Sequence, residues 1–365
     1  MENKIVIANL LHRPIRTVVS ALAVAVEVCM IMLVVGLTSG LVNEMARRQQ
    51  GVGAEVLVQP PNSSMFLSFS TAPMPISIGD HLRRLDHVQA VDPVLLQFNA
   101  AAVNTVYGID IDSFNSVTGG FVYHSGGPLK SPYDLLVDDV QARANRLKLG
   151  DKFLLFDHEF TVVGVVEHGK GGKLFIPLQT AQELSSSPNT ASIFYVKCTD
   201  PGYTDNVISE IRQFLPKYKV ISIEEWMSLM TSNNLPGLTA FVTAMISLSV
   251  GIGFLVIFLS MYTTITERTR EIGILKSLGA SKVYIIEGIL RESTFLCLIG
   301  IVVGLAGSLL ASRILHSGFP TLSVELTFQW AFYAAVLAVG GSLVGAFYPA
   351  FRASRLDPVD ALAYE

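Results

Sequence analysis

The sequence predicts a membrane protein with four transmembrane helices and an extracytoplasmic α+β domain inserted between the first helix and the second. Three observations point to this fold class. Of the 365 residues, 50% are apolar and only 15% are charged, whereas soluble globular proteins carry about 25% charged residues. Four apolar runs are each long enough to cross a bilayer as a helix, which takes about 20 residues. A longer and more polar stretch separates the first run from the second.

The apolar runs divide the chain into spans and connections. The first run is interrupted only by Glu27, and the second carries no charge. The predicted spans are residues 18–42, 238–265, 289–315 and 328–350. The predicted connections are an N-terminal segment at 1–17, the inserted domain with stalk extensions at 43–236, a segment at 266–288, a short loop at 316–327 and a tail at 351–365.

The distribution of lysine and arginine predicts the orientation. Lysine and arginine residues occur in both terminal segments and in the 266–288 segment, whereas the 316–327 loop has none. Because short cytoplasmic segments carry an excess of positive charge, we expect both termini and the 266–288 segment to be cytoplasmic, in a multi-pass protein of a bacterial inner membrane. Arg47 and Arg48 follow the first span and argue against this orientation, but the other segments outnumber them.

The inserted stretch has the local patterns of an α+β domain. Strand-like segments rich in β-branched or aromatic residues lie at 54–59, 160–166 and 192–197. Residues 138–147 and 203–214 have the acidic start or the apolar spacing of amphipathic helices. About 190 residues are enough to form a core of their own.

Several function classes lack their signatures. The net charge of −4 and a pI near 6.0 argue against a nucleic-acid-binding protein. The three cysteines show no metal-ligand spacing, and no metal site or catalytic centre is expected. The segment from Gly164 to Gly171 approaches a phosphate-binding loop, but Gly171 stands where a hydroxyl would bind magnesium. We therefore interpret residues 169–173 as a flexible hairpin turn between strands at 162–166 and 174–177.

Two stretches resemble a known family. The segment ERTREIGILKSLGAS at 267–281 is similar to the signature of FtsX-domain permeases, and PAFRASRLDPVDAL at 349–362 is similar to the end of such domains. YGIDIDSF at 107–114 and KLGD at 148–151, before FTVVG at 160–164, resemble a MacB-type periplasmic core domain. Unlike in MacB itself, we expect no ATPase domain fused at the N-terminus of this chain.

The resemblance implies a permease subunit of a bacterial ABC transporter of the MacB/FtsX (type VII) kind. ATP and magnesium would bind a separate ABC ATPase, and this chain would hold no cofactor and catalyse no reaction. Implied partners are that ATPase, the lipid bilayer and a second permease copy, most simply in a homodimer. A periplasmic adaptor and an outer-membrane channel are left open. ATP hydrolysis would move the extracytoplasmic domain by mechanotransmission, for export or for extraction of a substrate from the outer leaflet.

The alternative function is that of an FtsX-like regulator or scaffold, which would activate an extracytoplasmic hydrolase without transporting a solute. The MacB-like features of the inserted stretch favour the transporter. The sequence does not name the cargo.

The 266–288 segment is the candidate coupling site. Residues 268–278 are good helix formers, Ile272, Leu275 and Leu278 could form one apolar stripe, and Gly279 is a plausible helix stop. Such a stripe suits docking into a groove of a partner, and the resemblance identifies the helix as the coupling helix to the ATPase. The alternative is a basic interfacial loop. The candidate coupling residues are Glu267, Arg268, Arg270, Glu271, Ile272, Gly273, Leu275, Lys276, Leu278 and Gly279.

Two acidic residues in or near the spans are further candidates. A charge in the middle of a membrane is costly unless it is neutralised or paired. For Glu27 two interpretations stay open: a functional group that bonds to Ser260 or Thr263 or faces a dimer seam, or a tolerated, protonated side chain close to water. Glu292 is the second intramembrane polar candidate.

Small residues recur at the spacing that lets membrane helices approach closely. We expect them to serve helix packing rather than substrate binding. These residues are Gly36, Gly40, Gly300, Gly304, Gly341 and Gly345.

Overall fold

The computed structural model describes residues 14–61, 74–99, 104–229 and 236–357. The remaining residues include most of the predicted N-terminal segment, the last part of the tail, and the 230–235 part of the predicted stalk, which therefore lie outside the described residues. The chain divides into two compact units. One, here called the helical bundle, holds 1–40, 236–318 and 324–365, and the other, the α+β domain, holds 41–235 and 319–323.

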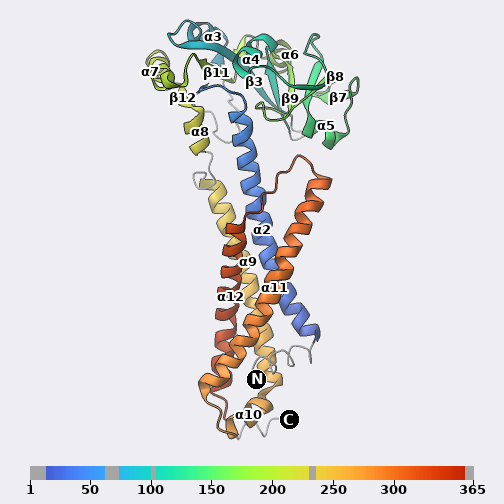
Figure 1. Cartoon of the computed structure of the whole chain (residues 1–365), viewed down its shortest axis with the longest axis vertical. Coiled ribbons are helices and arrows are strands. Elements are labelled where there is room, and N and C mark those ends of the chain that lie inside the picture. Colours follow the sequence, from blue (N-terminus) through green and yellow to red (C-terminus); the bar gives the residue numbers. More distant parts are fainter. Residues whose placement is uncertain (1–13, 62–73, 100–103, 230–235, 358–365) are drawn as a thin grey trace. The chain divides into compact units, whose positions relative to one another are not determined.

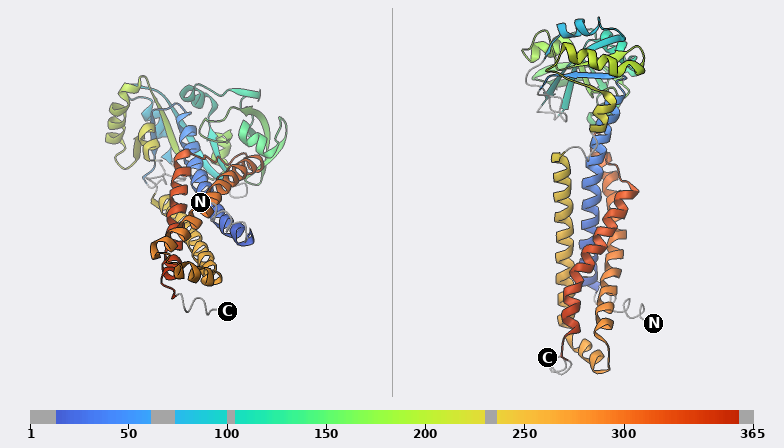
Figure 2. Two further views of the ribbon diagram at one scale, coloured as in Figure 1. Left: turned by 60° about the horizontal axis from the view of Figure 1, so that its bottom comes forward. Right: turned by 90° about the vertical axis from the view of Figure 1, so that its left-hand side faces the viewer.

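The helical bundle is built from four long helices, and each contains one predicted span (Figures 1 and 2). All four are long and apolar enough to cross a membrane. The first three extend beyond both ends of their predicted spans, and the fourth extends only beyond its C-terminal end. They are α2 (Pro14–Gln50), α9 (Pro236–Glu267), α11 (Lys282–Gly318) and α12 (Phe328–Ser354).

Glycines allow these helices to approach closely. A Cβ added to Gly300 of α11 would lie 2.6 Å from the Cβ of Val24, and one added to Gly304 would lie 2.6 Å from the carbonyl oxygen of Ala25. Both positions are therefore in backbone contact with α2. A Cβ added to Gly345 of α12 would lie 2.9 Å from the carbonyl oxygen of Phe254 on α9.

The other predicted packing glycines differ among themselves. Gly36 faces residues 324–326, and its carbonyl oxygen accepts a 2.9 Å hydrogen bond from the Glu325 amide. Gly40 is buried. Gly341 has only ordinary contacts, since an added Cβ would lie 3.5 Å from Val250. A larger residue would therefore fit more easily at Gly341 than at Gly300 or Gly304.

The α+β domain is organised around one mixed sheet. Among the described residues its strand order is β12-β1-β11-β3-β4-β9-β6-β8-β5, with β7 paired to β8, and β2 pairs separately with β10. The strands are β1 (Val56–Gln59), β2 (Met74–Pro75), β3 (Val88–Asn99), β4 (Asn104–Ile109), β5 (Tyr123–Gly126), β6 (Asp134–Asp138), β7 (Lys152–Leu155), β8 (His158–Val166), β9 (Leu174–Pro177), β10 (Thr190–Ala191), β11 (Ile193–Cys198) and β12 (Lys219–Ser222).

Short helices cover the sheet and connect its strands. They are α3 (Ser77–Leu82), α4 (Ile111–Thr118), α5 (Asp139–Asn145), α6 (Leu178–Leu184), η1 (Pro201–Tyr203), α7 (Thr204–Phe214) and α8 (Ile223–Leu229). Successive residues of a strand point to opposite faces, and Leu57 accordingly lies in a different core cluster from Val56 and Val58. Strand β1 is therefore buried on both sides, in agreement with its apolar residues Val56, Leu57 and Val58.

The local predictions for this domain were confirmed in all but one case. Strands β1, β8 and β11 and helices α5 and α7 lie where the patterns placed them. The predicted hairpin at 169–173 is wrong, because β6 lies between β8 and β9 in the sheet. The glycine-rich segment is instead a crossover connection, and its glycines serve a close contact described below.

Candidate functional site

The predicted coupling segment folds into one short helix, α10 (Thr269–Ser277), between α9 and α11 at one end of the bundle (Figure 1). The predicted helix and its stop are confirmed, since Gly279 has a φ of +94°. Only glycine adopts such a backbone conformation at little cost. The chain can therefore turn sharply there and enter α11.

One ion pair fastens the start of α10 to α11. Arg268 Nη1 lies 3.3 Å from Glu292 Oε2, and its Nε donates to Glu271 at 2.7 Å. The Glu292 side chain is 5% exposed. Burial makes an unpaired carboxylate costly, so the guanidinium of Arg268 explains how α11 tolerates this residue.

The other end of α10 is tied to α12. Lys276 Nζ donates to the carbonyl oxygen of Ser354 at 3.1 Å and also to that of Leu356. The last carbonyls of a helix have no partner within it, so Lys276 caps α12. Helix α10 is thus bonded to two helices besides the one it follows.

The apolar stripe differs from its prediction. Ile272 is 8% exposed and packs with Ile265, Ile285 and Ala353 inside the bundle. Leu275 and Leu278 are 43% and 80% exposed, and Ile274, which was not predicted, is 45% exposed. Ile272 therefore holds α10 to the bundle, whereas Ile274, Leu275 and Leu278 form what we call the exposed apolar face.

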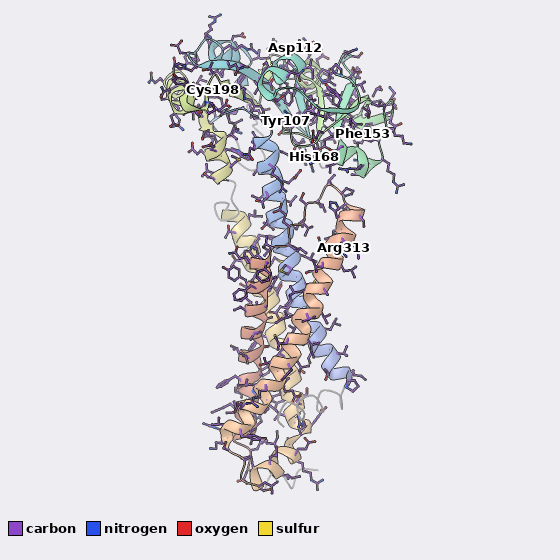
Figure 3. The ribbon with its side chains drawn as sticks, in the orientation of Figure 1. Tyr107, Asp112, Phe153, His168, Cys198 and Arg313 are labelled. Atoms are coloured by element: carbon purple, nitrogen blue, oxygen red, sulfur yellow. The ribbon has the colours of Figure 1, made fainter. Side chains whose placement is uncertain are left out.

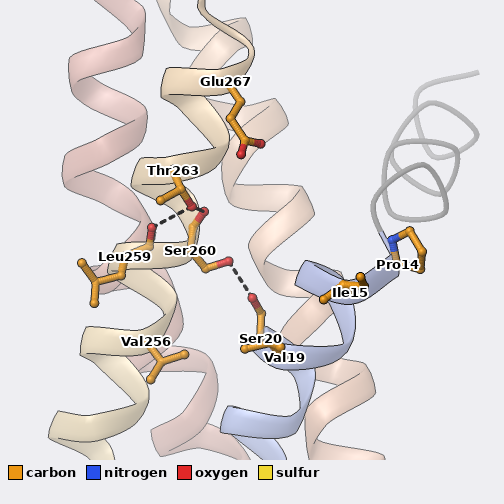
Figure 4. A pocket seen from close by; sticks show the side chains of 9 residues that line it. All are labelled: Pro14, Ile15, Val19, Ser20, Val256, Leu259, Ser260, Thr263 and Glu267. Atoms are coloured by element: carbon orange, nitrogen blue, oxygen red, sulfur yellow. Dashed lines mark hydrogen bonds between the residues drawn. The ribbon is translucent and has the colours of Figure 1, made fainter.

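The remaining candidate coupling residues differ in their surroundings. Gly273 is buried, and Arg270 and Glu271 are exposed. Glu267 lines a groove of about 660 Å³ between the start of α2 and the end of α9 (Figure 4). The Oγ atoms of Ser20 and Ser260 lie 2.6 Å apart across it.

Among the described residues, Glu27 makes no hydrogen bond to Ser260 or Thr263, which was one of the possibilities predicted for it. Ser260 bonds to Ser20, and Thr263 bonds to the backbone of its own helix. The Glu27 side chain is buried, and its Oε2 lies where a side chain on Gly253 of α9 would begin. The proposed bonds to Ser260 and Thr263 were wrong because a helix sequence does not fix which side faces which neighbour.

A second set of contacts surrounds the end of α2 within the α+β domain, and local sequence patterns barely indicate it. Arg48 Nη1 lies 2.8 Å from Asp138 Oδ2, and Arg48 Nε lies 2.7 Å from Glu44 Oε1. Gln49 Nε2 donates to the Tyr195 hydroxyl at 2.9 Å. The only sign was the presence of two arginines on the wrong side of the predicted first span.

Comparison with known proteins gives two family matches. A model described as "MacB-like periplasmic core domain" matches residues 17–214, and one described as "FtsX-like permease C-terminal" matches residues 243–358. The chain belongs to the MacB/FtsX permease family. The second match includes α10 and the ends of α11 and α12 that hold it, and the first includes Glu27, Arg48 and Asp138.

The relatives of this permease are longer than the chain itself. It is 27% identical to a macrolide export ATP-binding/permease protein MacB of Wolinella succinogenes over 96% of the chain and 58% of that protein. It is 35% identical to the uncharacterized ABC transporter permease YknZ of Bacillus subtilis over 40% of the chain and 37% of that protein. The chain thus spans less than two thirds of the length of either relative.

Solved structures of extracytoplasmic regions also match. The periplasmic region of MacB from Actinobacillus actinomycetemcomitans covers 48% of this permease and 92% of its own chain, with 16% identity and a TM-score of 0.38. The extracellular domain of YknZ covers 46% and 98%, with 14% identity and a TM-score of 0.34.

The described residues also bear on metal binding. Within them no group of three or more His, Cys, Asp or Glu side chains is placed to hold a metal ion. The candidate site is a helix that is bonded to two neighbouring helices and has an exposed apolar face.

Proposed function

We propose that this chain is the non-catalytic transmembrane subunit of a bacterial ABC transporter. A separate ABC ATPase would bind ATP and magnesium, dock on the exposed apolar face of α10 and drive motion of the α+β domain. That motion would export a substrate or extract it from the outer leaflet. The membership in a permease family supports the class, and the bound partner and the motion are part of the proposal.

The arrangement of α10 is the observation that carries this proposal. One side of the helix is fixed by Ile272, Arg268 and Lys276 to neighbouring helices. The other side exposes Ile274, Leu275 and Leu278. Apolar side chains grouped on one helix face are typical of a helix that docks in a groove of a partner. A force on that face would reach α11 and α12 directly, since both are bonded to α10.

The orientation in the membrane is part of the same proposal. Arg268, Arg270 and Lys276 would lie in the cytoplasm with both termini, by the excess of positive charge expected there. Arg48 no longer argues against this orientation, because it is buried in an ion pair with Asp138 instead of being a free flanking charge. The α+β domain would then lie outside the inner membrane.

The assembly would contain two copies of the chain and two ATPases. Four spans per chain give eight in a homodimer, and each copy presents one α10. A periplasmic adaptor and an outer-membrane channel would complete the route in a tripartite export system.

Purification in mild detergent followed by reconstitution in nanodiscs tests the proposal. We expect an ABC ATPase to copurify and its ATP hydrolysis to rise when the permease is present. Leu275→Asp and Leu278→Asp should weaken ATPase binding at least about tenfold, which is about 1.4 kcal/mol, because a charge would be buried in the interface. Leu154→Asp, at a residue of the α+β domain that is 61% exposed, is the matched control.

Two results would contradict the proposal. If both α10 variants bind and stimulate the ATPase as well as the control does, α10 is not the coupling helix. If hydrolysis responds only to an extracytoplasmic hydrolase partner and to no substrate, the regulatory alternative holds.

A further inference from the structure

The end of helix α2 is built into the α+β domain by buried polar contacts. Its last ten residues belong to that unit, and the helix runs from Pro14 to Gln50 without interruption. Arg48 is 6% exposed and its partner Asp138 is 1% exposed. Arg48 also donates from Nη1 to the carbonyl oxygen of Gly172 at 3.0 Å. The helix end is therefore held by charged groups in the interior of the domain.

Gln49, which follows Arg48 on α2, contacts a different part of the sheet. Gln49 is buried and bonds to the hydroxyl of Tyr195, which lies on β11. Asp138 lies at the end of β6, and β3, β4 and β9 separate β6 from β11. Neighbouring residues of a helix point about 100° apart, since there are 3.6 residues per turn. Arg48 and Gln49 thus reach two well-separated strands from one turn of helix.

The glycine-rich crossover at 168–173 encloses the same helix end. The Gly171 amide donates to the carbonyl oxygen of Arg48 at 2.9 Å, and a Cβ added to Gly51 would lie 2.0 Å from the carbonyl oxygen of Gly169. At one end of the crossover, His168 is bonded to Asp139 through both its amide and its ring Nδ1. Figure 3 labels His168 and Tyr107, whose ring packs against Gly172.

The electrostatics favour a geometric role for the Arg48–Asp138 pair over a stabilising one. Burial raises the pKa of Asp138 above its usual value although the Arg48 guanidinium opposes this. Burial is the largest influence on this carboxyl group, and the attraction of Arg48 acts against it. A buried ion pair often stabilises a fold no better than apolar residues of the same size would. What the pair does supply is a directional contact that fixes the angle of the helix.

We propose that Arg48 and Gln49 form a rigid joint that delivers a rotation or tilt of α2 to the α+β domain. One contact alone would let the helix pivot about it, whereas two contacts in different directions, enclosed by the 168–173 crossover, fix its orientation. The joint deepens the proposed function and rests on it for its purpose: Arg48 and Gln49 would be positioning residues that make the domain follow the membrane helix.

Distances between spin labels in the full chain test the joint without any ATPase or substrate. Labels at Leu41→Cys on α2 and Leu154→Cys on β7 occupy exposed positions, in a background where Cys29, Cys198 and Cys297 are replaced by alanine. We expect one narrow distance distribution. The triple variant Arg48→Met, Asp138→Asn and Gln49→Leu should widen it clearly, and Gln49→Leu alone should widen it less. The side-chain oxygen of asparagine at 138 can still accept the hydrogen bond from the Gln141 amide, so the cap of α5 is kept.

The matched control changes two exposed residues that make no contact described for the joint, Arg47→Met and Asp112→Asn, and should keep the narrow distribution. The fluorescence of Trp226, which is buried in the domain core, reports whether each variant is folded. If the triple variant does not fold, Gln49→Leu alone decides the question. A distribution identical to that of the parent in the folded triple variant, or in Gln49→Leu where only that variant folds, would overturn the joint.

A second measurement asks whether the joint transmits motion. In nanodiscs with the ATPase, labels at Leu154 of the two permease copies should change their separation on addition of ATP and vanadate. The triple variant should lose this change while ATP hydrolysis continues, and a retained change would contradict the transmitting role. If the parent protein shows no change at all, the proposed transport function fails, whereas the result with labels at Leu41 and Leu154 still decides the joint.

Discussion

The carboxylate of Glu27 occupies the space where Gly253 would carry a side chain: a Cβ added to Gly253 would lie 1.8 Å from Glu27 Oε2. The two residues lie on α2 and α9, and they bring these helices together around a buried acidic group. Glu27 Oε1 has no hydrogen-bond partner among the described residues. The contact therefore depends on shape, and it predicts that a methyl group at Gly253 would displace the carboxylate of Glu27.

Gly253→Ala should displace the flexible end of the Glu27 side chain and destabilise the bundle by up to about 1 kcal/mol, the low end of the usual cost of forcing extra atoms into a packed site. The double variant Gly253→Ala with Glu27→Ala should recover most of this loss, because the methyl group then enters vacated space. Thermal unfolding in detergent measures both effects. Gly251→Ala, on the same helix with open space around it, is the control and should unfold near the parent's temperature. Equal losses in the single and double variants would show that Glu27 does not fill this space.

The Arg268–Glu292 pair predicts how α10 is held. Glu292→Gln should weaken the contact between α10 and α11 and so increase hydrogen exchange in α10. The reason is that a charge-assisted hydrogen bond to a buried group contributes about 1.5–3 kcal/mol. Glu271→Gln removes the other partner of Arg268, but Glu271 is 62% exposed, and exposed pairs contribute about 0–1 kcal/mol. Mass spectrometry of exchanged peptides compares the two variants. If the amides of α10 exchange at the same rate in the two variants, Glu292 does not anchor the helix.

Much of the fold followed from local patterns. The four spans could be located because an apolar run of helix length has few other structures open to it. Helix α5 could be located because Asp138 caps it, and the end of α10 because Gly279 permits the turn. In each case the deciding residues lie close together in the sequence.

The parts that could not be predicted depend on residues far apart in the sequence. The partner of Arg48 lies 90 positions away, and nothing near Arg48 indicates Asp138. The hairpin prediction failed because β6, earlier in the chain, inserts between β8 and β9. Ile272 and Leu278 looked equivalent on a helix, and only the neighbouring helices show that Ile272 is the buried one.

The third prediction concerns the close contact between α2 and α11 at Gly300. Gly300→Ala would place a methyl group 2.6 Å from the Cβ of Val24 and 2.8 Å from the carbonyl oxygen of Ala21. Neither atom belongs to a flexible side-chain end, so the helices would have to separate. We expect a loss of about 1–3 kcal/mol in thermal unfolding. Gly307→Ala, on the same helix with nothing within 4 Å, should be neutral or slightly stabilising. Similar behaviour of both variants would contradict the close contact.

Asp92 predicts how the stability of the α+β domain depends on pH. Its side chain is fully buried on β3, and burial raises its pKa to about 8, while a 2.6 Å hydrogen bond from the Ser113 hydroxyl opposes the rise. An unfolded aspartate titrates near 3.9. The folded domain therefore retains a proton that the unfolded chain has lost between about pH 4 and pH 8. In this range the contribution of Asp92 to stability falls as pH rises.

Asp92→Asn should remove this dependence, since an amide does not titrate. We expect the variant to gain stability over the parent as pH rises from 5 to 9, by at least about 1 kcal/mol, roughly the cost of charging one group whose pKa has moved by one unit. The fluorescence of Trp226 in a Trp330→Phe background follows unfolding of this domain alone. Asp112→Asn, at an exposed position on α4, should follow the pH profile of the parent. A constant difference between Asp92→Asn and the parent at every pH would mean that Asp92 is already ionised in the folded protein.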